Sequence, residues 1–325
     1  MPSVEVNIPI IVIAGPTASG KSGLALALAE KLNGVVINAD SMQVYKDIPI
    51  LAAAPSTEDQ ARVPHRLYGI YDAAVRGNVV DWLALCRNEI ASARQKNKTP
   101  VVVGGTGFYL EALISGATPI PETPPAIRQE VADIFQNEGL EELYAYLQQH
   151  DTETAARLNP HDTTRICRAV EIIKHTGLPL SYWHRQPLNN IYTAKDFACI
   201  RIKPPRDILC EYIDKRFDAM LAAGAVAETR TLIARGLSDS LPAMRALGVQ
   251  ELKTYLENRC TLEEAAELAK CHSRQYAKRQ TTWFNRRFTA DYTLPEIFCE
   301  NTGAGEHFLY EIVDKLQKTH KFLAK

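Results

Sequence analysis

Residues 15–22 read GPTASGKS, and this spacing of two glycines, a lysine and a serine is typical of loops that bind phosphate groups. The glycines let the backbone curl so that several N–H groups point at one anion, and the following helix start adds partial positive charge. Lys21 is expected to reach the outer phosphates, and Ser22 to bind Mg²⁺. The apolar run IPIIVIA at 8–14 and the helical pattern after the loop supply the context that this motif requires. The predicted phosphate-binding residues are Gly15, Pro16, Thr17, Ala18, Ser19, Gly20, Lys21 and Ser22.

A carboxylate follows the next apolar segment. GVVIN at 34–38 leads into Asp40, within NADSMQVY. The carboxyl end of a parallel strand beside a phosphate loop is where open α/β sheets bind ligands. Asp40 could therefore hold a water on Mg²⁺ or act as a general base near leaving phosphates, or it could be only a turn or cap residue. After another apolar segment, Gly104 and Gly105 allow either close approach of a ligand or backbone, or a tight turn, and Thr106 follows them.

Basic residues gather locally. Between 270 and 288, six of them occur with no acid, and Lys270, Arg274 and Lys278 recur every four residues on one predicted helix face. With aromatic residues interleaved, this face could meet a nucleic-acid backbone, or it could be an ordinary solvated helix. Arg165 and Arg168 share a face of another predicted helix. They could grip phosphates or pair with neighbouring acids.

An α/β scaffold is expected to position these groups. Strands are predicted at 8–14, 34–38, 99–107 and 197–203, with helices at 20–33 and 80–96 and, later, at 205–223, 224–236, 244–257 and 261–288. Short apolar strands separated by helices indicate a parallel sheet covered on both faces. The proline-rich TPIPETPP begins a region that reads as helices only. We expect a core formed by 1–117 and 196–325, whose C-terminal region is helical, and a helical insertion at 118–195.

The overall composition identifies no partner. The 325 residues are 46% hydrophobic and 23% charged, with a formal net charge of −1. Seven scattered cysteines without CxxC pairs argue against a disulfide framework or a zinc ribbon. No apolar run approaches the length of a membrane span, and the N-terminus lacks a signal-peptide pattern. A cytoplasmic protein is expected, and nothing indicates a coiled coil, so a monomer is the default.

Several motifs together resemble one family. In order, they are GPTASGKS, ADSMQVY, PHRLYGI, VVVGGTGFYLEAL, NPHDTTRICRAVEI, RFDAMLAAGAVAETRTL, RALGVQEL and RQYAKRQTTWF. This set, spanning roughly residues 8 to 288, resembles the tRNA dimethylallyltransferases, the bacterial tRNA isopentenyltransferase family. The resemblance implies transfer of a dimethylallyl group from dimethylallyl diphosphate to N6 of the adenosine 3′ to a tRNA anticodon. The phosphate loop would then bind the diphosphate leaving group.

The resemblance also implies roles for individual residues. Asp40 matches the catalytic base, Thr106 a position near the target nucleotide, and Arg216 a diphosphate contact, while Lys21 and Ser22 with Mg²⁺ would stabilise the leaving charge. The insertion is expected to bind the anticodon arm. The implied tRNA-binding residues are Asp40, Ser41, Met42, Gln43, Thr106, Arg128, Thr164, Arg165, Arg168, Arg245, Gly248, Gln250, Arg274, Lys278 and Arg279.

Some positions depart from the family pattern. Lys46 replaces an arginine, Thr164 stands where glutamine is usual and Val249 where tyrosine is usual, and the lysine of a GTAKP-like segment is missing. Two other functions fit parts of the sequence. A small-molecule phosphotransferase could bind ATP at 15–22, but it would not need a long basic helix; a non-catalytic tRNA-binding protein would not need Lys21, Ser22 and Asp40 together. The sequence leaves physiological ATP binding open.

Overall fold

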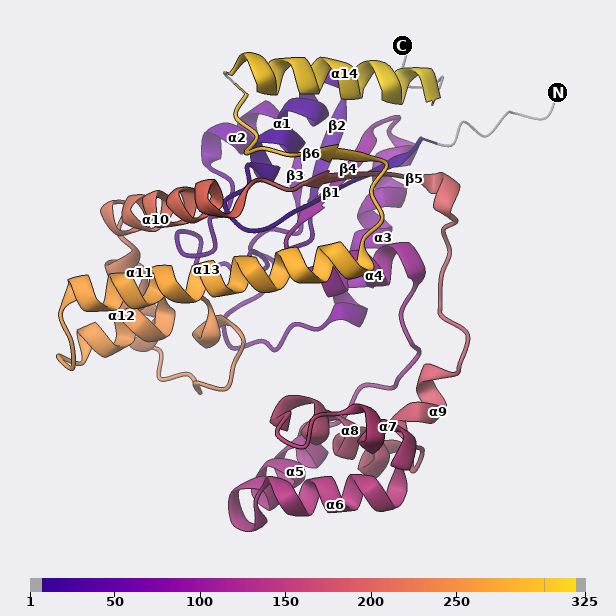
Figure 1. The fold of residues 1–325 in the computed structure, drawn as a ribbon, viewed down its shortest axis with the longest axis vertical. Helices are drawn as coiled ribbons and strands as arrows, with labels where there is room; N and C mark the ends of the chain where they lie inside the picture. The colour runs from indigo at the N-terminus through magenta and orange to yellow at the C-terminus, as the bar shows by residue number, and fades with distance from the viewer. Residues whose placement is uncertain (1–7, 301, 320–325) are drawn as a thin grey trace. The chain divides into compact units, whose positions relative to one another are not determined.

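The computed structural model describes residues 8–300 and 302–319. Within these residues, six parallel strands form one sheet in the order β3-β2-β4-β1-β5-β6 (Figure 1). The predicted α/β fold with a parallel-sheet core is confirmed. The strands are β1 (Ile10–Ala14), β2 (Gly34–Asn38), β3 (His65–Arg66), β4 (Thr99–Gly104), β5 (Phe197–Ile202) and β6 (Tyr292–Leu294).

Helices follow most of the strands. Those packed with the sheet or following it in the chain are α1 (Lys21–Lys31), α2 (Thr57–Arg62), α3 (Val79–Gln95), α4 (Gly107–Ser115), α10 (Arg206–Ala222), α11 (Ala225–Ile233), α12 (Val249–Leu256), α13 (Leu262–Arg287) and α14 (Gly303–Thr319). The helix expected at 244–257 is shorter than predicted, because a 3₁₀ turn at Ala243–Arg245 and left-handed Gly248, with φ 93°, precede α12. Five elements have no counterpart among those expected from the sequence: β3, β6, α2, α4 and α14.

Both faces of the sheet are buried, since every residue of β1, β2, β4 and β5 is buried and neighbours along a strand point to opposite faces. On one face, the core includes Ile11, Ile13 and Ile200 and the inner sides of α1 and α14. Figure 1 shows these two helices on the same side of the strands. Helix α3 packs on β2 and β4. This double cover explains the nearly continuous apolar strands of the sequence.

Local signals fix the ends of the longest helix, α13. The Thr261 hydroxyl accepts a hydrogen bond from the Glu264 N–H, and the Glu264 carboxylate accepts one from the Thr261 N–H. This reciprocal cap satisfies two backbone donors that the helix itself cannot. Arg286 and Arg287 lie in the last turn, where positive charge complements the helix dipole.

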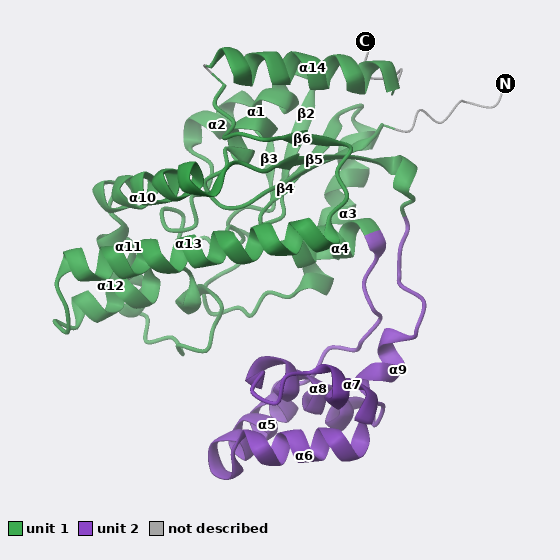
Figure 2. Cartoon of the chain, in the orientation of Figure 1, with its two compact units in different colours: residues 1–114, 192–325 green, residues 115–191 purple. Residues whose placement is uncertain are grey.

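The chain divides into two compact units, residues 1–114 with 192–325 and residues 115–191 (Figure 2). The second unit overlaps the helical insertion expected at 118–195, with each bound three or four residues earlier. The second unit contains α5 (Pro125–Glu138), α6 (Leu140–His150), α7 (Thr152–Arg157), α8 (Thr163–Thr176) and α9 (Leu180–His184) around its own apolar core. Buried Asp151 caps α7 through the Thr154 N–H and also accepts from the Ser181 N–H at 2.9 Å. Among the described residues, no helix has the length and apolar character needed to cross a membrane.

Candidate active site

Three adjacent strands bring the predicted chemical groups to one edge of the sheet. Strand β4 lies between β1 and β2, with Gly104 opposite Ala14 and Val103 opposite Asn38. The segments that leave these strand ends are the phosphate loop, the Asp40 loop and the Thr106 loop. The Thr106 loop lies more than sixty residues after the other two segments in the sequence, whereas the parallel register places the starts of all three segments side by side.

The phosphate loop curls before α1. Ala18 has φ 61° and Gly20 φ 85°, so left-handed residues alternate with others as in anion-binding backbone nests. A side chain at Gly20 would be strained by this φ, and its Cβ would lie 2.2 Å from the Phe298 carbonyl oxygen. The loop therefore requires glycine at this position. Exposed Ser22 lies in the first turn of α1, whose N–H groups have no acceptor within the helix.

Lys21 folds back on this loop, where its Nζ donates a 2.6 Å hydrogen bond to the Pro16 carbonyl. Burial lowers the pKa of Lys21 to about 8; the nearby Asp40 carboxylate raises it and the Arg216 guanidinium lowers it. The ammonium group is thus still mostly protonated at neutral pH. It can exchange the Pro16 carbonyl for the oxygen of an incoming phosphate.

Asp40 is held by its neighbours on β2. Its N–H donates to Asn38 Oδ1 at 2.8 Å, and Asn38 Nδ2 donates to the Asp40 and Leu67 carbonyls at 3.0 Å each. Asp40 Oδ1 accepts from the Met42 N–H at 2.9 Å. Asp40 is therefore a turn residue, as the structural alternative expected, yet its carboxylate also lines the cavity beside the phosphate loop. The hydrogen bond within the turn involves Asp40 Oδ1, so the same side chain can close the turn and line the cavity.

Thr106 joins the Asp40 loop through Ser41. The Thr106 hydroxyl accepts from the Ser41 N–H at 2.9 Å and donates to Ser41 Oγ at 3.1 Å. Arg216 reaches the site from α10, and its guanidinium donates to Thr17 Oγ1. Burial lowers the pKa of Arg216, whereas the charge of Asp40 raises it.

These residues share a hollow. A cavity of about 570 Å³ is lined by residues 17–22 together with Asp40 and Arg216. A second cavity of about 330 Å³ shares Asp40 and Arg216 with the first, and its wall includes the apolar side chains of Ile213 and Phe217. The first cavity is thus cationic at the phosphate loop, and the second is partly apolar. The Asp40 carboxylate lines both cavities. This arrangement suits a ligand with an anionic end and an apolar end.

Two parts of this site were not predicted from the sequence. Gln280, on α13, bonds to Thr17 and Gly105, whereas the basic and aromatic residues of that helix had indicated only a nucleic-acid surface. The segment after β6 lines the larger cavity with Ile297, Phe298 and Cys299. The Phe298 N–H donates to the Ser19 carbonyl at 3.1 Å. No motif marked this segment, because its role depends on how the chain returns to the phosphate loop.

The donor atoms of the site suit a hard cation. Ser22 and Asp40 supply oxygen to one cavity, and Mg²⁺ in proteins commonly takes one or two such ligands, with substrate phosphates and waters completing its shell. Among the described residues, the site included, no group of three or more His, Cys, Asp or Glu side chains could hold a metal ion. The cysteines are free thiols.

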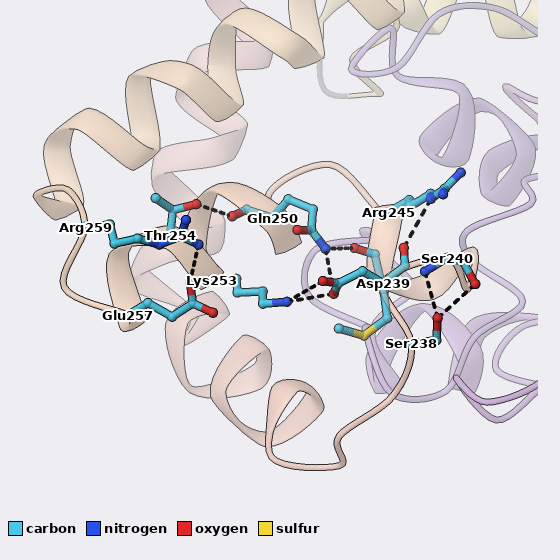
Figure 3. Close-up of polar contacts among 10 residues, drawn as sticks. Ser238, Asp239, Ser240, Arg245, Gln250, Lys253, Thr254, Glu257 and Arg259 are labelled. Carbon is cyan, nitrogen blue, oxygen red and sulfur yellow. Dashed lines mark hydrogen bonds and ion pairs between the residues drawn. The ribbon is translucent and has the colours of Figure 1, made fainter. Parts of the chain in front are cut away.

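The expected tRNA-binding residues near α12 are organised by Asp239 (Figure 3). Lys253 Nζ lies 2.7 Å from both of its carboxylate oxygens, and Arg245 Nε donates to the Asp239 carbonyl at 3.2 Å. Gln250 Nε2 donates to Asp239 Oδ1 at 3.4 Å and to the Met244 carbonyl at 2.7 Å. These bonds hold Arg245 and Gln250 in one fixed segment, with Arg245 exposed.

The basic face of α13 is partly neutralised by α10. Lys270 Nζ lies 2.7 Å from Asp218, and Arg274 Nη1 lies 2.5 Å from Asp214. Lys278 and Arg279, which follow on the same helix, are exposed. The stripe inferred from spacing is therefore cationic mainly at its C-terminal half.

In the second unit, both arginines of α8 form ion pairs with neighbouring acidic residues, which was one of the two expected roles. Arg165 pairs with Asp162 at 3.1 Å, and Arg168 pairs with Glu171 at 3.2 Å. Arg128 similarly lies 3.4 Å from Glu122. Thr164 is exposed at the start of α8.

Two of the departures from the family pattern have a structural setting. Lys46 Nζ forms an ion pair with Asp72 at 3.3 Å. Val249 is fully buried at the start of α12, so this change affects packing beneath the Arg245 segment and leaves its outer surface unaltered. Gly248 is buried and left-handed.

Comparison with known proteins confirms the family resemblance. Residues 43–287 match the family described as IPP transferase. The tRNA dimethylallyltransferases of Rhodospirillum centenum and Zymomonas mobilis are 46% and 44% identical over 308 and 290 residues, covering 95% and 89% of this chain and 98% and 91% of theirs.

Solved structures agree with this assignment. The tRNA isopentenylpyrophosphate transferase of Bacillus halodurans is 32% identical with a TM-score of 0.66, covering 98% of this chain and 100% of that one. A eukaryotic dimethylallyltransferase described as acting on tRNA is 28% identical with a TM-score of 0.79, covering 95% and 80%. The chain therefore belongs to the IPP transferase family, alongside proteins named tRNA dimethylallyltransferases.

Proposed function

We propose that this protein transfers a dimethylallyl group from dimethylallyl diphosphate to N6 of the adenosine 3′ to the anticodon in tRNA. The products are N6-isopentenyladenosine and diphosphate. The observation that carries the proposal is the shared carboxylate: Asp40 lines both the cationic cavity at the phosphate loop and the partly apolar cavity beside it. Family membership supplies the class of reaction.

Charge separation is the main energetic problem of this reaction. The allylic C–O bond breaks and its electron pair leaves with the diphosphate, where Lys21, Arg216 and the loop N–H groups offset the growing negative charge. Mg²⁺ bound near Ser22 would supply further positive charge to the same oxygens. The buried setting makes these interactions stronger than they would be in water.

The acceptor is a weak nucleophile, because the lone pair of the exocyclic amine is delocalised into the adenine ring. The N6 nitrogen forms the new N–C bond and loses one proton, which Asp40 accepts. Thr106 is hydrogen-bonded to Ser41, the residue after Asp40, and is proposed to contact the target nucleotide. The base must leave the anticodon stack to reach this site, which costs least in a loop that is already unpaired.

The tRNA would be held through its backbone by the exposed cations. Lys278 and Arg279 on α13 and Arg245 near α12 are the strongest candidates, because they are exposed. The paired arginines of the second unit would need to exchange a carboxylate for a phosphate. We propose the anticodon stem-loop as the partner, a monomer as the working state and the cytoplasm as the location.

The deciding experiment incubates the purified protein with unmodified tRNA, Mg²⁺ and either dimethylallyl diphosphate or ATP, followed by mass spectrometry of the digested nucleosides. An isopentenyl mass on adenosine that depends on the prenyl donor is expected. Phosphate transfer or hydrolysis with ATP and no adduct would refute the proposal in favour of a phosphotransferase. Light scattering of the free protein tests the monomer.

A further inference from the structure

One side chain connects the two loops on which the proposed reaction depends. Gln280 is only 5% exposed, on the inner side of α13. Its Oε1 accepts a hydrogen bond from the Thr17 N–H at 2.8 Å, and its Nε2 donates one to the Gly105 carbonyl at 2.8 Å. The amide therefore spans from the phosphate loop after β1 to the loop after β4.

Each end of this bridge adjoins a residue of the site. The Thr17 hydroxyl also accepts a hydrogen bond from the Arg216 guanidinium. Gly105 directly precedes Thr106, whose hydroxyl accepts the Ser41 N–H next to Asp40. The bridge thus links the residues that would hold the diphosphate to those that would hold the attacking amine.

The Gln280 amide lies close to the Gly105 backbone. A Cβ on Gly105 would lie 2.3 Å from Gln280 Nε2, so a side chain at this position would displace the amide. The helix that carries Gln280 is itself anchored to the sheet by buried Arg201 of β5, whose Nη2 donates to Asn285 Oδ1 at 2.8 Å. Phe284, one turn after Gln280, is fully buried. The part of α13 that carries Gln280 is therefore held against the sheet.

We propose that Gln280 is a positioning residue that sets the separation between the bound diphosphate and the Asp40–Thr106 side of the site. This inference rests on the proposed function. A carboxamide offers one acceptor and one donor at a fixed spacing, which is what the Thr17 N–H and the Gly105 carbonyl require. Reactions in which two bound groups must align lose about 10²-fold in rate for a displacement of about 1 Å. Gln280 acts through the two loops and contacts neither reacting atom.

Two replacements test the bridge because they differ in hydrogen bonding at nearly constant size. Gln280→Met removes both bonds, and its kcat should fall by about 10²-fold while the KM for the prenyl donor changes much less. Gln280→Glu keeps an acceptor for Thr17, but an ionised carboxylate repels the Gly105 carbonyl. A protonated carboxyl group has both an O–H donor and a C=O acceptor.

The glutamate variant should therefore recover activity as the pH falls. Burial favours the neutral form of a carboxyl group, so its rate relative to wild type should rise on the acidic side of neutrality. Gln275 lies on the exposed side of the same helix, and Gln275→Met and Gln275→Glu are the matched controls. Their rates should track wild type at every pH. Thermal unfolding and tRNA binding of all variants are measured in parallel.

The outcomes separate this inference from the proposed function. A wild-type protein that forms no prenyl adduct refutes the proposed function. An active wild type with an unimpaired Gln280→Met, or with a Gln280→Glu whose relative rate does not change with pH, overturns the positioning role. If the methionine variant fails to fold, the pH dependence of Gln280→Glu decides alone, since a loss of packing would not recover on acidification.

Discussion

Replacing Asp40 by asparagine should remove the proposed base while leaving its loop intact. The Asp40 backbone is held by the buried Asn38 amide, and its Oδ1 accepts the Met42 N–H at 2.9 Å. An asparagine carbonyl oxygen can accept the same bond, so the turn should persist. What is lost is a charged group able to take a proton from the N6 amine.

The expected magnitude follows from that single loss. General base catalysis contributes roughly 10²–10⁴ in rate, which corresponds to about 2.7–5.4 kcal/mol of activation free energy. A second effect is electrostatic. Asp40 raises the pKa of Lys21, which burial lowers to about 8, so loss of the carboxylate should lower that pKa further and weaken donor binding above neutrality.

The assay must separate these effects. Single-turnover reactions with excess enzyme and saturating donor at about pH 7 report the chemical step, and filter binding reports tRNA affinity. The chemical rate of Asp40→Asn should fall by at least about 10²-fold with tRNA affinity nearly unchanged. Asp207→Asn, on the exposed first turn of α10, is the matched control. A rate for Asp40→Asn within about threefold of wild type would refute the base assignment.

Three further changes probe binding and stability. Gly20→Ala should weaken donor binding by about tenfold or more, measured by calorimetry, because φ is 85° and the new Cβ would meet the Phe298 carbonyl at 2.2 Å. Lys278→Glu with Arg279→Glu should lower tRNA affinity and reduce the slope of log K against log salt by about 2, since two phosphate contacts are lost. Asp151→Ala should cost about 2 kcal/mol of unfolding free energy at neutral pH, read from the urea-unfolding midpoint, because it removes buried charge-assisted hydrogen bonds. Burial raises the pKa of Asp151, but hydrogen bonds from Thr154 and Ser181 outweigh it and hold that pKa below its usual value. Its contribution should be complete above about pH 4 and be lost as the pH falls through the folded-state pKa.

Controls exist for each of these changes. A Cβ at Gly23 would lie 3.6 Å from the nearest Phe298 atom, so Gly23→Ala should fold normally; equal donor affinity in the two alanine variants would contradict the strain argument. Lys195→Glu reverses an exposed charge elsewhere and is the control for the α13 substitutions. If Lys278→Glu with Arg279→Glu leaves the slope of log K against log salt unchanged, α13 does not contact the tRNA backbone. A stability difference for Asp151→Ala that stays constant down to pH 3 would contradict the assigned role of its charge.

The long elements and the first chemical groups could be predicted because their signals are local. The strand at 34–38 matches β2, and the helices predicted at 80–96 and 261–288 match α3 and α13 within a residue or two at each end. Strands β3 and β6 have two and three residues, too few for an alternating pattern to be recognised. They exist because neighbouring strands supply their hydrogen-bond partners.

The sequence by itself determined the phosphate loop, the strand that leads into Asp40 and the motif set that identifies the family. Glycine placement, a lysine and an apolar run are properties of adjacent residues, so they can be read without knowing the fold. The tertiary structure decided the electrostatics and the completeness of the site. Asp214 and Asp218 neutralise half of a helix face that reads as purely basic, since they arrive from α10. Gln280 and Phe298 reach the phosphate loop from more than 250 residues away, and only the packing of α13 and the returning chain on the sheet could bring them there.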